Sequence, residues 1–512
     1  MIAPSIRHRT AARGRRDRWL ALITVTVALA SLPAIVRIVR TIPLRVSLDT
    51  NEGWNAYQAV AAFAGDLYPH APRLFFNNYP PLSFYLVGLA GRWIGDPIVA
   101  GRLIACAAFA ALAVILGLVA RQMRCTRGEA AFAAALFVAT TLSLSHYVGV
   151  DDPQFLGQAV ATASLLFVIP EPRTLRRLWL AAALMSAGIF IKHNVVALPI
   201  ACIVWLWMHD RVAARRLVTA GASFAVAGLS LCVWMYGAGF LEGLATPRGY
   251  STAVAARAFI RWIVRVPVFA AALVVCLRRF PRDRDVAFCA WYAGIASGVG
   301  LVFLGGDGVD WNVMFESNWA WCLTAAVALR ACEGITSNAK TAKTAKTNCP
   351  MIPLRALRPL RSDVFFHELL NRLRRSTLAV AFALLPLVAA ALAVHRASVD
   401  PASSLASRMA GASAFEDDIA FVASRRGPAL CEDLALCFWA GKPPEVDVVN
   451  LEQHVRRGTR RADELVRLID RRYYAVVQLN AGHSLLDGTA RDALQRSYVL
   501  ARQSQAGMLF VP

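Results

Sequence analysis

Long apolar segments alternate with short basic loops along most of this 512-residue chain. The first apolar run covers residues 19–39, and a helix of that length spans the ~30 Å hydrocarbon core of a bilayer. The chain is 57% hydrophobic and only 17% charged, which is a membrane composition. The pattern predicts an α-helical polytopic membrane protein.

The hydropathy pattern predicts about eleven transmembrane helices. The pair at 178–191 and 194–208 is one apolar run broken by Lys192-His193-Asn194, and each half is short for a bilayer. Residues 81–95 are too short to span, so we expect an interfacial or re-entrant helix there. The predicted spans are 19–39, 97–120, 129–147, 154–170, 178–191, 194–208, 217–238, 259–277, 286–304, 316–332 and 377–395.

The loops fall into two classes that alternate in sequence. Basic residues gather in one class and acidic residues in the other, so the formal net charge of +22 indicates topology rather than nucleic-acid binding. If the basic loops are cytoplasmic, every acidic loop lies on the opposite face. The basic loops are 1–18, 121–127, 171–177, 209–216, 278–285 and 333–376, and the acidic loops are 40–80, 149–153, 239–258 and 305–317.

The predicted spans and the sides of the membrane assigned to the loops divide the chain into five parts. A basic cytoplasmic N-terminus (1–18) precedes a transmembrane module (19–332) with outer loops at 40–80 and 149–153. A basic cytoplasmic linker (333–376) and a last span (377–395) follow. Residues 396–512 mix strand-like and charged helix-like segments, which predicts a small periplasmic α/β domain. That domain is either a stabilising cap or part of an acceptor-binding site.

The predicted exported domain contains two of the eleven cysteines, Cys431 and Cys437. An oxidising compartment would allow them to form a disulfide. On one continuous helix they would lie about 9 Å apart along its axis, too far to bond. The sequence leaves both arrangements open.

The first outer loop contains two acids, Asp49 and Glu52, directly after the first span. A carboxylate at the membrane boundary can accept a proton from an acceptor hydroxyl or amine of a lipid-linked reaction. The loop is long and aromatic, with Trp54, Tyr57 and Tyr79 as candidate pocket residues. Residues 53–64 are amphipathic, so we expect that segment to lie along the membrane surface.

Three further polar clusters fall on the same predicted face. Asp151 and Asp152 are candidates for positioning an acceptor or a metal ion, although Asp152-Pro153 is also a normal helix start. Lys192 and His193 interrupt an apolar run. Ionisable groups at membrane depth are costly, so these two are candidates for function. Lys192 would suit a donor phosphate as a point charge, alone or together with His193. The segment at 305–318 adds the candidate pocket residues Asp310 and Asn312.

The sequence shows no hydrolase nucleophile motif, P-loop or Rossmann fingerprint. Energy from nucleotide hydrolysis on this chain is therefore not expected. An already activated donor is the natural alternative.

The stretches "NEGWNAYQAVAAFAGDLYP" and "NNYPPLSFYLVGLAGRWIG" resemble the first outer loop of GT-C-fold membrane glycosyltransferases of the protein O-mannosyltransferase and aminoarabinose transferase type. "YVGVDDPQF", "KHNVVALP" and "GVDWNVMFE" resemble later stretches of that superfamily. In these enzymes an acidic pair, usually Asp-Glu, supplies the catalytic base. Here the pair is Asn51-Glu52, with Asp49 displaced by two residues, so both Asp49 and Glu52 remain candidates.

The resemblance implies a bacterial inner-membrane glycosyltransferase. Its donor would be a polyprenyl-phosphate sugar, and its acceptor an envelope glycan, lipid or protein on the periplasmic face. The two acidic motifs permit a divalent cation, Mg or Mn, without requiring one. The alternatives are a transporter or flippase of lipid-linked glycans, which predicts ionisable residues in mid-span, and a non-catalytic envelope assembly subunit.

Overall fold

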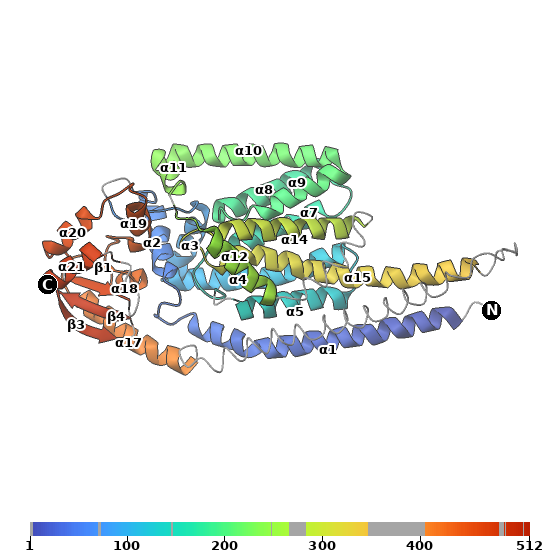
Figure 1. Cartoon of the computed structure of the whole chain (residues 1–512), viewed down its shortest axis with the longest axis horizontal. Helices are drawn as coiled ribbons and strands as arrows, with labels where there is room; N and C mark the ends of the chain where they lie inside the picture. Colours follow the sequence, from blue (N-terminus) through green and yellow to red (C-terminus); the bar gives the residue numbers. More distant parts are fainter. Residues whose placement is uncertain are drawn as a thin grey trace.

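The computed structural model describes residues 4–69, 73–144, 147–246, 248–265, 283–346, 405–480, 486, 488–504 and 506–512. A bundle of long helices occupies one end of the molecule, and a small domain that contains a sheet lies at the other (Figure 1). The N-terminus lies at the far end of the bundle from that domain.

The bundle consists of helices that match most of the predicted spans. Leu20–Thr41 of α1, α4, α10 and α14 are each long and apolar enough to cross a membrane. Predicted span 377–395 and most of 259–277 fall outside the described residues. The helices are α1 (Pro4–Thr41), α4 (Pro97–Gln122), α5 (Arg127–Leu144), α6 (Gln154–Ala163), α7 (Leu165–Val168), α8 (Leu175–Ile191), α9 (Ala197–His209), α10 (Arg211–Tyr236), α11 (Ala238–Leu244), α12 (Thr252–Arg265), α14 (Arg284–Phe303), η1 (Trp311–Met314) and α15 (Phe315–Lys346).

Local sequence signals set several of these helix ends. Asp96 caps α4 by accepting hydrogen bonds from the backbone N–H groups of Ile98 and Val99, and Pro97 occupies the first turn. Asp210 caps α10 and Asp283 caps α14 in the same way. Each cap satisfies backbone donors that a helix start leaves unpaired.

The predicted basic loops meet at one end of the bundle through ion pairs. Arg330 of α15 pairs with Asp283 at 2.8 Å and with Asp285 at 2.6 Å, and Arg124 also contacts Asp285 at 2.6 Å. Arg173 and Arg284 both pair with Glu171. Three of the predicted basic loops, 121–127, 171–177 and 278–285, therefore share one end of the bundle.

The C-terminal domain is the predicted α/β unit. Its four strands have the order β1-β2-β4-β3, with β1 parallel to β2 and the other pairs antiparallel. Both β1, an edge strand, and β2, an inner strand, are fully buried. Its elements are α17 (Leu405–Ser424), β1 (Ala429–Cys431), α18 (Leu434–Trp439), α19 (Val448–Arg456), α20 (Asp463–Asp470), β2 (Val476–Leu479), α21 (Gly488–Ser497), β3 (Val499–Ser504) and β4 (Gly507–Val511).

The disulfide that the sequence left open is present. Cys431 ends β1 and Cys437 lies on α18, so the two residues are not on one helix, and their Cα atoms are 6.0 Å apart. A turn between strand and helix brings them within bonding range.

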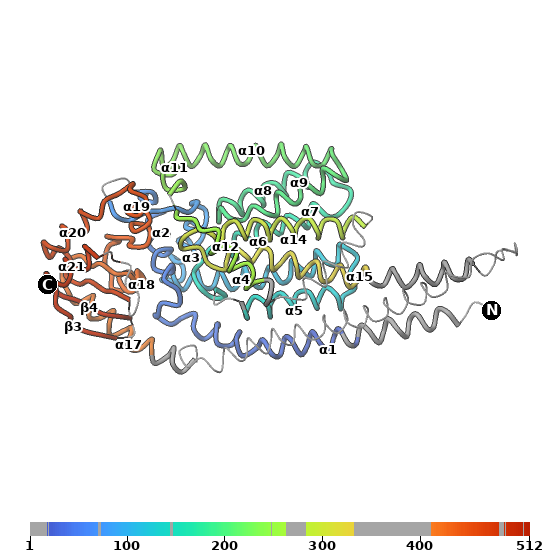
Figure 2. The backbone as a smooth tube through the Cα atoms, in the orientation of Figure 1, coloured from blue at the N-terminus to red at the C-terminus, as the bar shows by residue number. Residues whose placement is uncertain are grey.

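The first outer loop forms α2 (Asn51–Ala64) and α3 (Leu82–Ile94), which lie between the bundle and the C-terminal domain (Figure 2). Every residue from Glu52 to Ala59 is buried. The expectation of a helix lying along the membrane surface is therefore wrong for α2. An amphipathic pattern specifies an apolar face, and here protein rather than lipid covers the helix.

The C-terminal domain and the first outer loop share one hydrophobic core. Trp54 and Tyr57 of α2 pack in the same cluster as Leu434 of α18 and Val476 of β2. Polar contacts reinforce this interface: the Tyr57 hydroxyl donates to the Lys442 carbonyl at 2.7 Å. The domain is therefore an integral part of the fold.

Gly53 permits the close approach of α18 to α2. A Cβ atom at this position would lie 2.0 Å from the backbone nitrogen of Ala435. Gly53→Ala should destabilise the protein by about 1–3 kcal/mol, because rigid backbone would have to move. It should also expose the α2–α18 interface to limited proteolysis.

Gly221→Ala in α10 is the matched control, because a Cβ atom there meets nothing within 4 Å. It should leave the proteolysis pattern and the melting temperature unchanged or slightly improved. Equal behaviour of the two variants would contradict the tight α2–α18 contact.

Candidate functional site

A buried ion pair lies at the start of the first outer loop. Arg102 of α4 donates from Nε to Glu52 Oε1 at 2.7 Å and from Nη2 to Glu52 Oε2 at 2.6 Å. Both side chains are fully buried. A bidentate pair of this kind is strong and geometrically specific.

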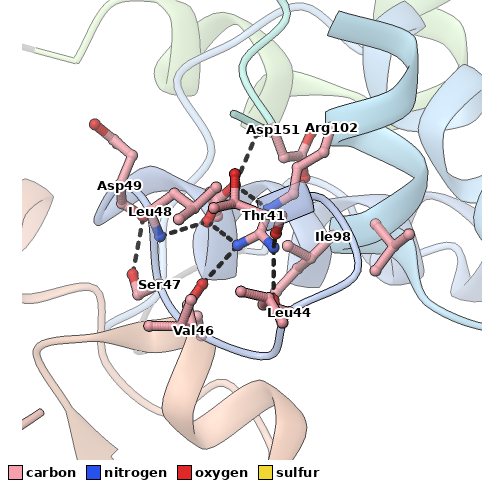
Figure 3. Close-up of polar contacts among 12 residues, drawn as sticks. Thr41, Leu44, Val46, Ser47, Leu48, Asp49, Ile98, Arg102 and Asp151 are labelled. Atoms are coloured by element: carbon pink, nitrogen blue, oxygen red, sulfur yellow. Dashed lines mark hydrogen bonds and ion pairs between the residues drawn. The ribbon is translucent and has the colours of Figure 1, made fainter. Parts of the chain in front are cut away.

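The same two side chains organise the chain around them (Figure 3). Arg102 also donates to the carbonyls of Leu44 at 2.7 Å and Val46 at 2.6 Å. Glu52 accepts from the backbone N–H groups of Leu48 at 2.9 Å and Asp151 at 3.1 Å. The pair thereby fastens the chain after α1 and the loop after α5 to the start of α4.

Asp49, the other candidate base, is only half-buried and lies outside this network. Its Oδ1 accepts from the backbone N–H of Asn51 at 2.9 Å. Figure 3 shows its side chain directed away from Arg102. The assignment of either acid as the base stays a prediction, but Glu52 has all its lone pairs engaged and Asp49 is the more accessible carboxylate.

A cavity of about 400 Å³ lies between the bundle and the C-terminal domain, and its lining begins at Thr50, the residue after Asp49. Several segments that are distant in sequence line it, one of them from the C-terminal domain. From the predicted site they include Trp54, Tyr79, Lys192, His193, Asp310 and Asn312, joined by Thr50, Asn51, Tyr147, Arg248, Asp307, Glu432, Asp447 and Asn450. The predicted pocket residues therefore converge, with one exception.

That exception is Tyr57. Its ring packs against Phe75 and Phe438, with centroid distances of 5.9 and 5.1 Å. With its hydroxyl bonded to the Lys442 carbonyl, it anchors the C-terminal domain and does not line the cavity.

Lys192 sits at the inner wall of the cavity. Its ammonium group lies 3.3 Å from Asp152 Oδ2 and 3.8 Å from the centre of the Tyr79 ring. Burial lowers the pKa of Lys192, but Asp152 and Tyr79 raise it by more than burial lowers it. The net pKa is therefore above its usual value. Lys192 is therefore a fixed cation, and His193 next to it packs edge-on against Tyr79 at 5.7 Å.

The two adjacent acids have different surroundings. Asp152 pairs with Lys192 and caps the backbone N–H of Gln154 at 2.7 Å, so both the cap and the polar-site interpretations apply to it. Both acids line a small void between α2, α3, α4 and α6, and neither lines the large cavity. The difference between them is that Asp152 has Lys192 as an ion-pair partner.

The C-terminal domain contributes polar groups that the sequence did not mark. Asn450 accepts from Asn78 Nδ2 at 2.9 Å, and Asp447 accepts from Asn450. Burial raises the pKa of Asp447 to about 6, and that of Asp433 beneath the cavity wall to about 7. The domain therefore supplies one wall of the cavity.

Arg248 is a second residue that sequence reasoning missed. It lines the cavity from the segment after α11, and its guanidinium makes no ion pair within the part of the chain that the structure describes. Its only sequence signal is that it is one of two arginines, with Arg257, in a loop predicted to be acidic.

No set of three His, Cys, Asp or Glu side chains among the described residues has an arrangement that could hold a metal ion. Asp152, a candidate for positioning an acceptor or a metal ion, is paired with Lys192.

Residues 78–236 match a family model described as dolichyl-phosphate-mannose-protein mannosyltransferase. The structure is similar along nearly its whole length to ArnT from Cupriavidus metallidurans in the apo state, with a TM-score of 0.60, 15% identity and 98% of each chain covered. The chain therefore has the GT-C fold of ArnT.

A second ArnT structure, bound to undecaprenyl phosphate, matches this GT-C protein with a TM-score of 0.57 and 15% identity over 96% of this chain and 98% of that one. No curated protein matches it significantly by sequence. The resemblance stated from the loop motifs is therefore confirmed at the level of the fold.

Breaking the buried ion pair should cost more stability than any other single charge change in this region. Glu52→Gln leaves Arg102 buried without a counter-ion, and we expect about 3–5 kcal/mol of destabilisation. The free energy of unfolding of the purified protein in detergent measures this loss.

The exposed pair between Glu452 and Arg456 provides the control. Glu452→Gln should change stability by no more than about 0.5 kcal/mol. A Glu52→Gln variant as stable as this control would show that the ion pair does not hold the loop.

Proposed function

We propose that this GT-C protein transfers a sugar from a polyprenyl-phosphate donor to an envelope glycan, lipid or protein on the periplasmic face of the bacterial inner membrane. The observation that carries the proposal is the cavity described above. It lies at the outer end of the bundle and combines a buried cation, a nearby carboxylate and a wall from the C-terminal domain. The undecaprenyl phosphate bound to ArnT supports a lipid-linked donor.

Asp49 is our choice for the base. Its carboxylate takes the proton of the acceptor hydroxyl or amine as the acceptor atom attacks the anomeric carbon. The bond between that carbon and the phosphate oxygen breaks, and polyprenyl phosphate leaves. Glu52 cannot accept a proton without losing its pair with Arg102, so it positions the loop rather than acting in the reaction.

Lys192 and Arg248 are our choice for holding the donor phosphate. Lys192 acts as a fixed point charge, and Arg248 offers a planar fork that matches phosphate oxygens. Both line the same cavity. Because Asp152 neutralises part of the Lys192 charge, the phosphate is held firmly enough to react but can leave as product.

The mechanism that we propose uses no metal ion. A requirement for Mg or Mn stays a separate question, which turnover in the presence of a chelator would answer. Of the residues in these steps, Lys192 and Arg248 line the cavity, and Asp49 directly precedes the lining residues Thr50 and Asn51.

Three observations support the proposed orientation. The basic loops share one end of the bundle, which the positive-inside rule makes cytoplasmic. The C-terminal domain lies at the other end (Figure 1), and its residues Asp447 and Asn450 line the cavity. The disulfide in that domain fits an oxidising periplasm.

The transporter alternative predicts charged residues in the middle of spans. Among the described spans, the buried charged side chains are Arg102, Glu129 and Glu316, and each lies within the first two turns of its helix. Their positions near helix ends favour an enzyme whose chemistry occurs at the membrane boundary.

Asp49→Asn should lower turnover about 10²- to 10⁴-fold, because the amide cannot accept the acceptor proton. It should leave the melting temperature unchanged, since Asn keeps the oxygen that bonds to Asn51. The measurement is release of polyprenyl phosphate from a panel of polyprenyl-phosphate sugars, with an envelope extract as acceptor. Full turnover in the variant would remove Asp49 as the base.

Arg248→Gln should raise the KM for the donor about 10- to 100-fold, because a charge-assisted contact to phosphate is lost. The exposed Arg426→Gln is the matched control and should leave KM unchanged. An equal effect of both variants would indicate a general loss of positive charge rather than a phosphate contact.

A further inference from the structure

Two buried amide side chains in the cavity wall have polar atoms without a hydrogen-bond partner. Asn194 and Asn312 both line the cavity, and they are only 9% and 8% exposed. Asn194 Nδ2 donates to Gln154 Oε1 at 3.0 Å, but its Oδ1 has no partner among the described residues. The Asn312 amide makes no hydrogen bond with any residue that the structure describes. Buried polar groups are rarely left unpaired, so the two amides point to a ligand.

Helix α6 brings the two segments that carry these amides together. Gln154 and Gln158 are four residues apart, so they lie one turn apart on the same face of α6. Gln154 bonds to Asn194, and Gln158 Nε2 donates to the Phe315 carbonyl at 3.2 Å. Phe315 directly follows η1, the short helix that carries Asn312. The loop before α9 and the turn before α15 therefore share one face of α6.

A buried carboxylate ties the same two segments together a little further along each. Glu316 Oε1 accepts from the backbone N–H of Leu198 at 2.6 Å. Glu316 follows Asn312 by four residues, and Leu198 follows Asn194 by four residues. Both Glu316 and Leu198 are buried. The backbone that carries both amides is therefore anchored on each side of the cavity floor that they form.

The amides lie next to the cation that we assign to the donor phosphate. Lys192 precedes Asn194 by two residues, and both line the cavity together with Arg248. In a polyprenyl-phosphate sugar, the anomeric carbon is bonded directly to a phosphate oxygen. A phosphate held by Lys192 and Arg248 therefore places the sugar ring in the part of the cavity that this loop lines.

The free polar atoms fit the hydroxyl groups of a sugar. Asn194 Oδ1 can only accept a hydrogen bond, whereas the Asn312 amide can both donate and accept. Asp310 adds a carboxylate that lines the cavity and makes no ion pair with any described residue. A hydroxyl group both donates and accepts, so sugar hydroxyls satisfy all three side chains. A carboxylate on the sugar would instead be repelled by Asp310, because the phosphate already occupies the two cations.

We propose that Asn194 and Asn312 are specificity-determining residues that bind the ring hydroxyls of the donor, and that the donor sugar is uncharged rather than a uronic acid. This inference rests on the proposed function, because it takes the cavity as the donor site. It adds to that function a site for the sugar ring beside the site for the phosphate.

Binding of lipids with and without a sugar tests the assignment. The probes are polyprenyl phosphate and the polyprenyl-phosphate derivatives of mannose, glucose, galactose, arabinose and glucuronic acid. Each is titrated into the purified full-length protein in detergent. Wild type should bind polyprenyl phosphate and at least one of the four neutral-sugar lipids. If it binds polyprenyl phosphate but none of those four, the proposal is overturned.

Asn312→Leu should weaken the binding of such a neutral-sugar lipid about 10- to 100-fold, because a sugar hydroxyl loses its partner. Polyprenyl phosphate should bind as it does to wild type, since it has no sugar ring. The melting temperature should not fall, because Leu has nearly the same volume as Asn and removes an unpaired polar group. An equal loss for both kinds of lipid, or no loss for either, would contradict a sugar contact at Asn312.

Asn318→Leu is the matched control, because Asn318 is a buried amide that does not line the cavity. Its Nδ2 donates to the hydroxyls of Thr140 and Thr141, each at 3.0 Å. The variant should therefore lower the melting temperature and leave the affinities for all lipids unchanged. If the two Leu variants weakened sugar binding equally, the effect would be that of any lost buried amide, and the sugar site would be rejected.

A second comparison uses wild type alone. The glucuronic acid lipid should bind at least about 10-fold more weakly than the best-bound neutral lipid, because its carboxylate meets Asp310 and an acceptor-only oxygen. Equal or tighter binding of the glucuronic acid lipid would overturn the assignment of an uncharged sugar.

Turnover separates this inference from the proposed function. If sugar binding depends on Asn312 but no polyprenyl phosphate is released with an envelope extract, the sugar site stands and the transferase activity fails. If wild type and Asn312→Leu turn over every donor equally, the transferase activity stands and the sugar site fails.

Discussion

The buried Glu52–Arg102 pair is the interaction on which the geometry of the site depends. The Arg102 guanidinium has five donor hydrogens. They donate to the Glu52 carboxylate and to backbone carbonyls of the segment that follows α1. Glu52 in turn accepts from the loop that carries Asp151. One ion pair thus sets the position of the first outer loop relative to α4 and the loop after α5. The half-buried Asp49 owes its place beside the cavity to this anchor.

The large features of the fold could be predicted because they follow from hydropathy and charge. The spans, the two classes of loop and the terminal α/β domain each produce a signal within a short window of sequence. The convergence of Lys192, Asp310 and Tyr79 could also be expected, since each lies in a loop on one face. The resemblance in loop motifs agreed with the fold that the structure shows.

What the sequence did not reveal are contacts between segments far apart in the chain. Arg102 is an ionisable residue within a predicted span, which by itself suggests that it has a buried partner. Nothing in the sequence identifies that partner as Glu52, fifty residues earlier. The roles of Arg248 and Asn450 depend on the C-terminal domain folding back onto the first outer loop. The disulfide was ambiguous because the boundary between β1 and α18 falls between its two cysteines. The amphipathic pattern of α2 could not distinguish a lipid surface from a protein one.

The core that α2 shares with the C-terminal domain has a consequence for biosynthesis. The first outer loop leaves the ribosome early, but its packing partners, Leu434 and Val476 among them, come more than 350 residues later. Until those residues have been synthesised, Trp54 and Tyr57 lack the apolar surfaces that bury them in the finished protein. The cavity wall around Asp447 is also missing at that stage. The cavity is therefore completed last, so a chain still being synthesised has its first helices but no formed cavity.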